Sequence, residues 1–157
     1  MVDIAVFVDV QNIYYTTREI FGRSLDYRKL WKKVSAQGDI RIANAYAIES
    51  EHEGQIRFQK ALYNIGFNVK LKPFIKRRDG SAKGDWDVGI TIDVLDAARN
   101  IKTVILMSGD GDFELLIRKI KGSYGVSTEV YGVKKLTSQT LINATDKFIA
   151  IEDDLLI

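Results

Sequence analysis

The stretch Thr103-Val104-Ile105-Leu106-Met107-Ser108-Gly109-Asp110-Gly111-Asp112-Phe113 begins as an apolar run and ends in two carboxylates. Its first five residues are apolar or β-branched, which predicts a strand buried on both faces. Apolar residues at helical spacing begin at Phe113, so the two aspartates stand where a strand gives way to a helix. That junction falls at the carboxyl edge of the sheet, where open α/β sheets bind ligands. Asp110 and Asp112 are equally typical of turns and helix caps, so this stretch alone leaves both interpretations open.

A second apolar run, residues 4–8, also ends in a carboxylate. Asp9 follows the run directly, and Asn12 lies at the expected start of a helix over 12–21, which it could cap. Strands that are far apart in the sequence can be neighbours where the strand order of a doubly wound sheet reverses. We therefore expect Asp9 and Asp110 to converge at that point.

The rest of the chain alternates between expected helices and strands. Apolar spacing and helix-end signals predict helices over 27–37, 51–65, 86–99, 113–121 and 136–144. Apolar runs or alternation predict strands over 40–47, 69–74, 127–131 and 148–151, and the lysines and proline of 69–74 favour a position near the sheet edge. This alternation is typical of an α/β fold whose parallel sheet is covered on both faces. The length of 157 residues fits one domain over 1–157.

The expected helix over 86–99 carries two further carboxylates of interest. At about 100° per residue, Asp87 falls within the apolar arc, which includes Val88 and Ile92, whereas Asp93 falls on the polar side. An inward carboxylate at a helix start could bind free backbone N–H groups or face a site. Asp87 is therefore the stronger functional candidate, and Asp93 is the weaker one.

Composition excludes several classes of site. The chain has no cysteine, so it has no disulfide framework and no thiolate nucleophile or ligand, which agrees with a cytoplasmic protein. No apolar run approaches the length of a membrane span, so we expect no membrane partner. His52 is the only histidine and is expected on the surface, and the tyrosines are expected to serve packing. Neither a phosphate-binding GxxxxGK[ST] loop nor a GxGxxG dinucleotide motif is present.

The net charge of +2 is too small to indicate a nucleic-acid partner, so any evidence for such a partner must come from the positions of the charges. One marked run, residues 76–85, contains Lys76, Arg77, Arg78 and Lys83. Such a run is usually a solvated loop, but it could also be an arm that contacts phosphates.

Converging carboxylates point to a metal. Three of them at close range repel each other unless a cation neutralises them. Oxygen ligands select Mg²⁺ or Mn²⁺ over zinc, and these ions serve phosphate-ester chemistry. Asn12 could add a neutral ligand or orient a water molecule.

Three motifs together resemble the NYN domain of the LabA-like (DUF88) group, within the PIN-like nuclease superfamily. They are Val8-Asp9-Val10-Gln11-Asn12, Asp85-Trp86-Asp87-Val88 leading to Asp93, and Ser108-Gly109-Asp110-Gly111-Asp112-Phe113. The resemblance implies a three-layer α/β/α sandwich with a mainly parallel, PIN-like (Rossmann-like) sheet. It also implies that the protein hydrolyses RNA with Mg²⁺ or Mn²⁺. It implies metal binding by Asp9, Asp87 and Asp110, supported by Asn12, Asp93 and Asp112. Residues 83–88 contain one residue more than the usual Lys-Gly-Val-Asp-Val, which leaves Asp85 as either a ligand or a cap.

The first hypothesis is a metal-dependent ribonuclease in which water, activated at the aspartate cluster, attacks the scissile phosphorus. Its RNA contacts would come from Lys76, Arg77, Arg78, Lys83 and Ser108. The second hypothesis is a non-catalytic regulatory module that keeps the fold, binds RNA or a protein and could act as a homodimer. A third is a metal-dependent phosphatase that acts on a small phosphate ester.

Overall fold

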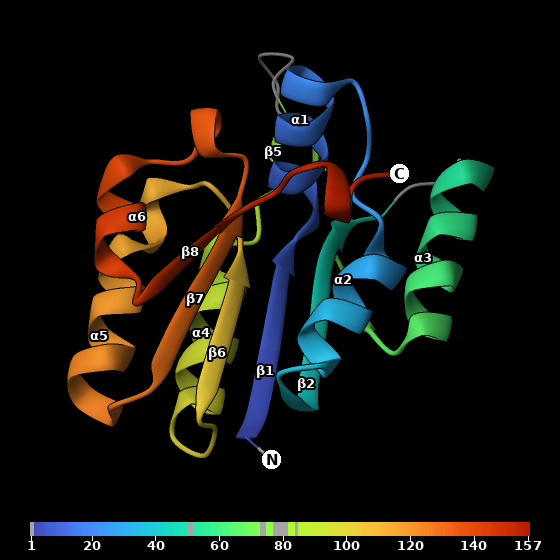
Figure 1. Ribbon diagram of the computed structural model, residues 1–157. Helices are drawn as coiled ribbons and strands as arrows, with labels where there is room; N and C mark the ends of the chain where they lie inside the picture. The colour runs from blue at the N-terminus through green and yellow to red at the C-terminus, as the bar shows by residue number, and fades with distance from the viewer. Residues whose placement is uncertain (1, 50–51, 73–74, 77–81, 84) are drawn as a thin grey trace.

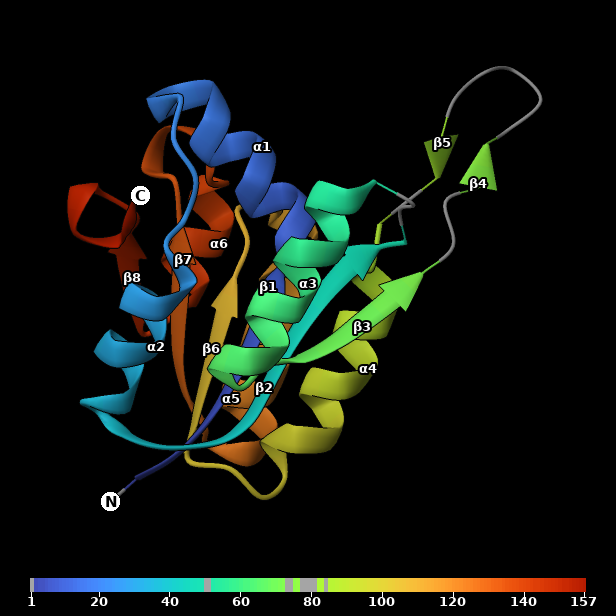
Figure 2. The ribbon, with the colours of Figure 1, turned by 90° about the vertical axis from the view of Figure 1, so that its right-hand side faces the viewer.

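The computed structural model describes the chain except residues 1, 50–51, 73–74, 77–81 and 84 (Figure 1). Its main sheet has six strands in the order β3-β2-β1-β6-β7-β8, and each neighbouring pair is parallel. A separate antiparallel pair, β4 and β5, lies beyond the end of β3 and away from the main sheet (Figure 2). The strands are β1 (Val2–Asp9), β2 (Gly38–Ile48), β3 (Asn68–Lys72), β4 (Ile75–Lys76), β5 (Ala82–Lys83), β6 (Thr103–Met107), β7 (Ser127–Gly132) and β8 (Lys147–Ala150).

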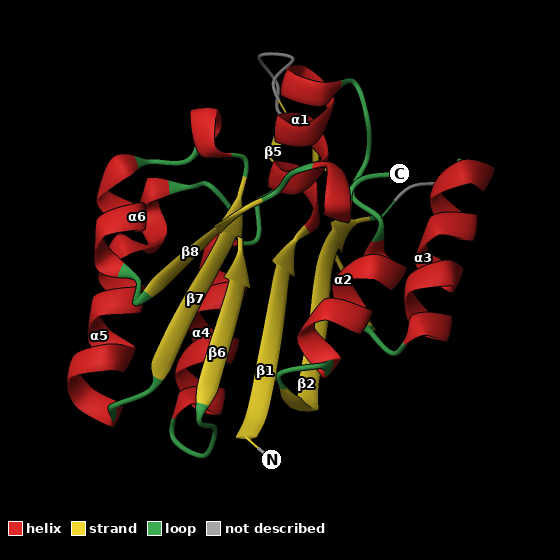
Figure 3. Cartoon of the chain, viewed as in Figure 1, coloured by secondary structure: helices red, strands yellow, loops and turns green. Residues whose placement is uncertain are grey.

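Helices cover both faces of the sheet (Figure 3). Helices α1, α2 and α3 pack on one face, and α4, α5 and α6 pack on the other. The α-helices are α1 (Val10–Phe21), α2 (Tyr27–Ser35), α3 (Glu53–Ile65), α4 (Asp87–Ala98), α5 (Glu114–Tyr124) and α6 (Gln139–Ala144), and the short 3-10 helices are η1 (Gly111–Phe113), η2 (Lys134–Leu136) and η3 (Asp153–Leu155). This arrangement confirms the α/β/α sandwich expected from the sequence.

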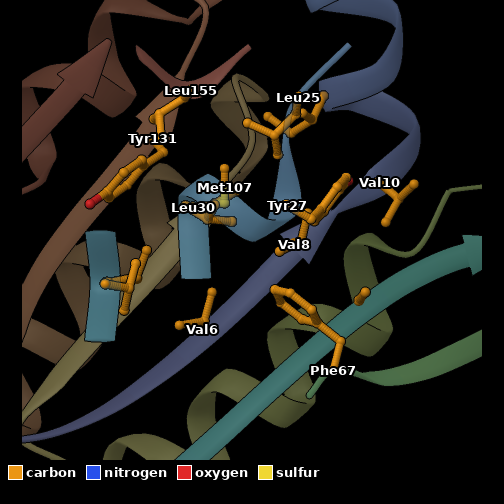
Figure 4. Packing of buried hydrophobic residues seen from close by; sticks show 14 of the residues in the cluster. Val6, Val8, Val10, Leu25, Tyr27, Leu30, Phe67, Met107, Tyr131 and Leu155 are labelled. Carbon is orange, nitrogen blue, oxygen red and sulfur yellow. The ribbon is translucent and has the colours of Figure 1, made fainter. Parts of the chain in front are cut away.

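Strand β1 shows why the sheet needs helices on both faces. Its side chains alternate. Val6 and Val8 enter the core under α1 and α2 (Figure 4), and Phe7 enters the core under α4 and α5. All three are almost fully buried. Burial of one such side chain stabilises the fold by about 1.5–3 kcal/mol, so a continuous apolar strand is stable only between two layers.

The strand order reverses beside β1. From β1 the chain builds β2 and then β3 on one side, and it later builds β6, β7 and β8 on the other. Val8 pairs with Met107, so Asp9 and Ser108 emerge side by side at the carboxyl edge. The expected convergence of the two strand ends is therefore confirmed, and it falls where open α/β sheets bind ligands.

Three local expectations need correction. Helix α1 begins at Val10, so Asn12 lies within its first turn and is not the N-cap. The expected helix over 136–144 is divided into η2 and α6, because the chain between them bends to let Ser138 N–H donate to Gly109 O at 3.0 Å. On α4, Val88 and Ile92 are 71% and 54% exposed, because the face that packs on the sheet is the one with Ile90 and Val94.

The end of the chain packs against the connection between α1 and α2. Leu156 forms a bridge with Leu25, and Ile157 N–H donates to Ser24 O at 2.9 Å. This places the C-terminal residues beside α1, whereas the N-terminus lies at the opposite edge of the sheet (Figure 1). Among the described helices, none is both long and apolar enough to cross a bilayer.

Candidate metal centre

Three carboxylates meet at the carboxyl edge of the sheet. Asp87 is the first residue of α4, Asp110 follows β6, and Asp112 lies in η1. Each offers an oxygen atom, and these atoms lie within 4.8 Å of one another. Asp87 and Asp110 are half-buried and Asp112 is exposed, so the group has a protein side and an open side.

The resemblance implied Asp9 as a metal ligand and Asp112 as a supporting residue, but the group contains Asp112 and not Asp9, which lies at the end of β1. Asp9 is 8% exposed, and Ser108 Oγ donates to its Oδ2 at 3.0 Å. Burial raises the pKa of Asp9 to about 6; the bond from Ser108 opposes this rise, and the charges of Asp110 and Asp85 add to it. The interaction with Asp110 places Asp9 in the electrostatic field of this carboxylate group.

The pKa of Asp87 is raised further than that of Asp9. Burial, followed by the nearby Asp110 and the charges of Asp85 and Asp9, raises its pKa to about 7. Such mutual repulsion is costly in the absence of a positive charge. An all-oxygen donor set of this kind fits Mg²⁺ or Mn²⁺, which usually bind a few carboxylates and retain water.

The loop after β6 is fixed by hydrogen bonds. Asp110 Oδ1 accepts from Asp112 N–H at 2.9 Å, and Ser108 Oγ accepts from Asp110 N–H at 3.2 Å. Asn12 Oδ1 accepts from Gly109 N–H at 2.9 Å, which ties the first turn of α1 to this loop. Asp110 is therefore both a cap and a member of the carboxylate group, and the two interpretations of the sequence are compatible.

Both glycines of this loop are required by close packing. A Cβ atom on Gly109 would lie 2.6 Å from Leu136 O, and one on Gly111 would lie 2.7 Å from Ser138 Oγ. The segment after β7 therefore packs directly on the carboxylate loop. Its exposed Lys135 is brought to the same edge of the sheet, a position that sequence spacing does not reveal.

Asp93 lies apart from the carboxylate group. Its Oδ2 accepts from Lys70 Nζ and from Tyr46 Oη, each at 2.7 Å. Burial acts to raise the pKa of Asp93, but these bonds and the charge of Lys70 outweigh it and lower that pKa. Asp93 thus joins α4 to β2 and β3, and its placement supports a positioning role for it.

The residues expected to contact nucleic acid differ in where the structure places them. Ser108 is fully buried against Asp9, so its assignment as an RNA contact is corrected: its hydroxyl positions a carboxylate instead. Lys76 and Lys83 belong to the paired strands β4 and β5. Arg77 and Arg78 lie outside the described residues.

A lysine of β3 that the sequence analysis did not single out, Lys72, contacts the residues that precede α4. Asp85 Oδ1 accepts from Asp87 N–H at 3.2 Å, so Asp85 acts as a cap that also repels its neighbours. Lys72 Nζ donates to Asp85 O at 2.9 Å and lies 5.2 Å from the centre of the Trp86 ring. Lys70 and Lys72 share one face of β3, because side chains two residues apart on a strand point the same way. That alternation is the signal that could have linked both lysines to α4.

Comparison with known proteins gives a consistent result. The family model of the NYN domain matches residues 3–152. The low amplitude and bright protein LabA of Synechococcus elongatus is 28% identical over 158 residues, which cover 96% of this chain and 84% of that protein. A protein of unknown function from Vibrio parahaemolyticus, VPA0982, has a crystal structure with a TM-score of 0.95 to this one; it is 51% identical, and the match covers 99% of this chain and 96% of that chain.

Proposed function

The chain belongs to the NYN domain family, which is of the PIN-like nuclease type, and on this premise we propose that it is a divalent-metal-dependent ribonuclease. The reaction is hydrolysis of an RNA phosphodiester bond at the carboxyl edge of the sheet. The observation that supports this most is the meeting of Asp87, Asp110 and Asp112 within 4.8 Å, with the charge of the buried Asp9 acting on Asp87. Such a group is costly for the metal-free fold and suited to a cation and a phosphate.

Asp87, Asp110 and Asp112 would hold Mg²⁺ or Mn²⁺, and Asp9, which interacts electrostatically with Asp110, would add negative charge. A cation bound there supplies Lewis-acid stabilisation of the phosphate and activates water. Ser108 fixes Asp9, and Asn12 fixes the backbone of Gly109, so the carboxylates keep their positions when substrate arrives.

Positively charged side chains would hold the RNA backbone. Lys76, Arg77, Arg78 and Lys83 keep the role expected from the sequence, and Lys135 joins them on the side of η2. These contacts would bind phosphates and carry no sequence information.

The test is cleavage of labelled single-stranded and hairpin RNA by purified protein with Mn²⁺, Mg²⁺ or EDTA. Asp110→Asn should lower the rate at least about 100-fold, since a metal contributes several kcal/mol to charge stabilisation. Asp96→Asn is the matched control, because Asp96 is an exposed carboxylate on the same helix as Asp87 and is not part of the group. Calorimetric titration of Mn²⁺ into both variants shows whether a lost rate reflects lost metal.

Three outcomes would overturn the proposal. Equal cleavage by wild type and Asp110→Asn would assign the activity to a contaminant. RNA binding without cleavage in either metal would favour the non-catalytic module, and cleavage of a phosphate monoester alone would favour the phosphatase.

A further inference from the structure

A cleft of about 1070 Å³ opens between the first turns of α1, the carboxyl end of β2 and the start of α3. Its floor is apolar and includes the buried Leu25 and Tyr27 and the half-buried Phe58. Tyr14 and Tyr15 line it as well, yet they are 48% and 61% exposed. The volume lies just above the roughly 300–1,000 Å³ that is usual for small-molecule sites.

Two residues that line the cleft are connected to the carboxylate group, one through the chain and one through a hydrogen bond. Val10 lines the cleft and directly follows Asp9 in the chain. Ala47 also lines it, and Ala47 O accepts from Trp86 Nε1 at 2.9 Å, one residue before Asp87. Burial and then the charge of Asp9 raise the pKa of Tyr27 in the floor. A ligand at the carboxylates can therefore extend into the cleft by passing the first turn of α1.

The lining favours a neutral ring over a phosphate. Among the described residues that line the cleft there is one carboxylate, Glu49, and no lysine or arginine. A phosphate would therefore meet no compensating charge there, whereas the N–H groups of a heterocycle would find an acceptor. The sequence predicts packing roles for the tyrosines, and this fits Tyr27, which meets Phe58 edge-on, with ring centres 5.5 Å apart. Tyr14 and Tyr15 pack on each other at the surface, with ring centres 5.5 Å apart and ring planes at 74°, and both remain exposed at the cleft.

We propose that this cleft binds a nucleobase of the RNA chain whose phosphodiester lies at the carboxylate group, an inference that rests on the proposed function. Tyr14 and Tyr15 provide aromatic surface for stacking, and Glu49 accepts hydrogen bonds from the edge of the base. Arg18, whose guanidinium lies 6.0 Å from the centre of the Tyr14 ring, adds positive charge beside the path of the backbone. A base can enter the cleft only if it is unpaired, so the site selects single-stranded RNA.

The test measures binding separately from cleavage. Anisotropy of a labelled single-stranded RNA is followed with Ca²⁺ in place of Mn²⁺, and the RNA is checked on a gel for integrity afterwards. Tyr14→Ala and Tyr15→Ala should each weaken binding about tenfold, the effect of losing one stacked base. Tyr14→Phe keeps the ring and should bind within about twofold of wild type. Tyr63→Ala is the matched control, because Tyr63 is 74% exposed and lies outside the cleft.

RNAs that lack one base link the effect to the cleft. When the base that occupies the cleft is removed, wild type and Tyr14→Ala should bind the RNA equally well. Glu49→Gln should change the preference among the four bases at that position, while the affinity for the base-free backbone stays the same. A fully base-paired RNA of the same length should not respond to Tyr14→Ala.

The inference and the proposed function can fail separately. If Asp110→Asn abolishes cleavage but the Tyr14 and Tyr15 variants bind like wild type, the nuclease stands and the base site is wrong. If RNA is bound through the tyrosines but never cut, the base site stands and the nuclease is wrong. Absence of RNA binding by wild type, or an equal loss in Tyr63→Ala, also overturns the base site.

Discussion

Asp87 combines partial burial with repulsion from neighbouring carboxylates, and its pKa lies at about 7 instead of the usual 3.8. The folded protein therefore holds a proton that the unfolded chain has lost, and folding stability falls as the pH rises from about 4 to about 7. We expect Asp87→Asn to raise the free energy of unfolding of the metal-free protein at pH 8 by about 1 kcal/mol, a value reduced for solvent screening. Urea unfolding in EDTA measures it. Asp96→Asn, on the same helix, should change stability by less than about 0.5 kcal/mol, and a destabilised Asp87→Asn would contradict the assigned repulsion.

The same residues make metal binding depend on pH. Protons compete with the cation for Asp87, whose pKa is about 7, and for Asp9, whose pKa is about 6. The affinity for Mn²⁺ should therefore be about tenfold or more lower at pH 6 than at pH 8, and binding near pH 6.5 should release protons. Calorimetry in two buffers with different ionisation enthalpies counts the released protons. An affinity that is constant between pH 6 and pH 8 would show that these carboxylates do not bind the ion.

At the scale of elements, the carboxylate loop is built by the packing of η2 on Gly109. A methyl group at this position would meet the backbone oxygen of Leu136, so Gly109→Ala should cost about 1–3 kcal/mol and weaken metal binding as well. Gly122→Ala is the matched substitution in α5, where a Cβ atom would have no neighbour within 4 Å. It should stabilise the protein by about 0.5–1 kcal/mol, because alanine favours helix. Thermal and urea unfolding of the pair measure both effects, and equal stabilities would contradict the packing described.

Asp93 connects α4 to the edge of the sheet. Asp93→Asn should lower stability by about 1–2 kcal/mol, because Lys70 loses the partner at 2.7 Å in a half-buried pair. Cleavage should stay within about tenfold of wild type, in contrast to Asp110→Asn. Unfolding and cleavage measured on the same preparations distinguish the two roles, and a full loss of activity without a loss of stability would make Asp93 catalytic. The double variant with Lys70→Met should be less destabilised than the sum of the single changes predicts.

At the scale of the whole molecule, a bound cation would link elements that are distant in the chain. Asp87 and Asp110 begin or precede helices on one face of the sheet, and Asp9 ends the strand beside β6. A ligand that binds only the folded protein stabilises it by about 2.7 kcal/mol at 100 times its Kd. We therefore expect saturating Mn²⁺ to raise the Tm by about 5–10 °C, and Asp110→Asn to abolish the shift. Differential scanning fluorimetry measures both, and an equal shift in the variant would indicate binding elsewhere.

Much of this arrangement was predictable from the sequence, for reasons that the structure makes plain. Strand β6 is buried on both faces, so its sequence is a continuous apolar run. The abrupt end of this run allowed the site to be predicted at the carboxyl edge of the sheet. Placing Asp9 beside this run needed only the rule that doubly wound sheets reverse their strand order. The burial of Ser108 was not predictable, because it depends on how the ends of β1 and β6 meet in space. The exposure of Val88 could not be predicted from apolar periodicity either. Periodicity gives the direction of a helix face, but it does not show how far the sheet extends beneath that face.

The two ends of the chain lie at opposite edges of the sheet, and this determines how the protein is best handled. Ile157 lines the cleft beside α1, so a purification tag fused after it would begin on the wall of the proposed base site. A tag placed ahead of Val2 would begin at the amino edge, beyond the far end of β1 from Asp9. Immobilisation through the N-terminus should therefore leave RNA access open. Anchoring through the C-terminus should obstruct the cleft while leaving every carboxylate in place.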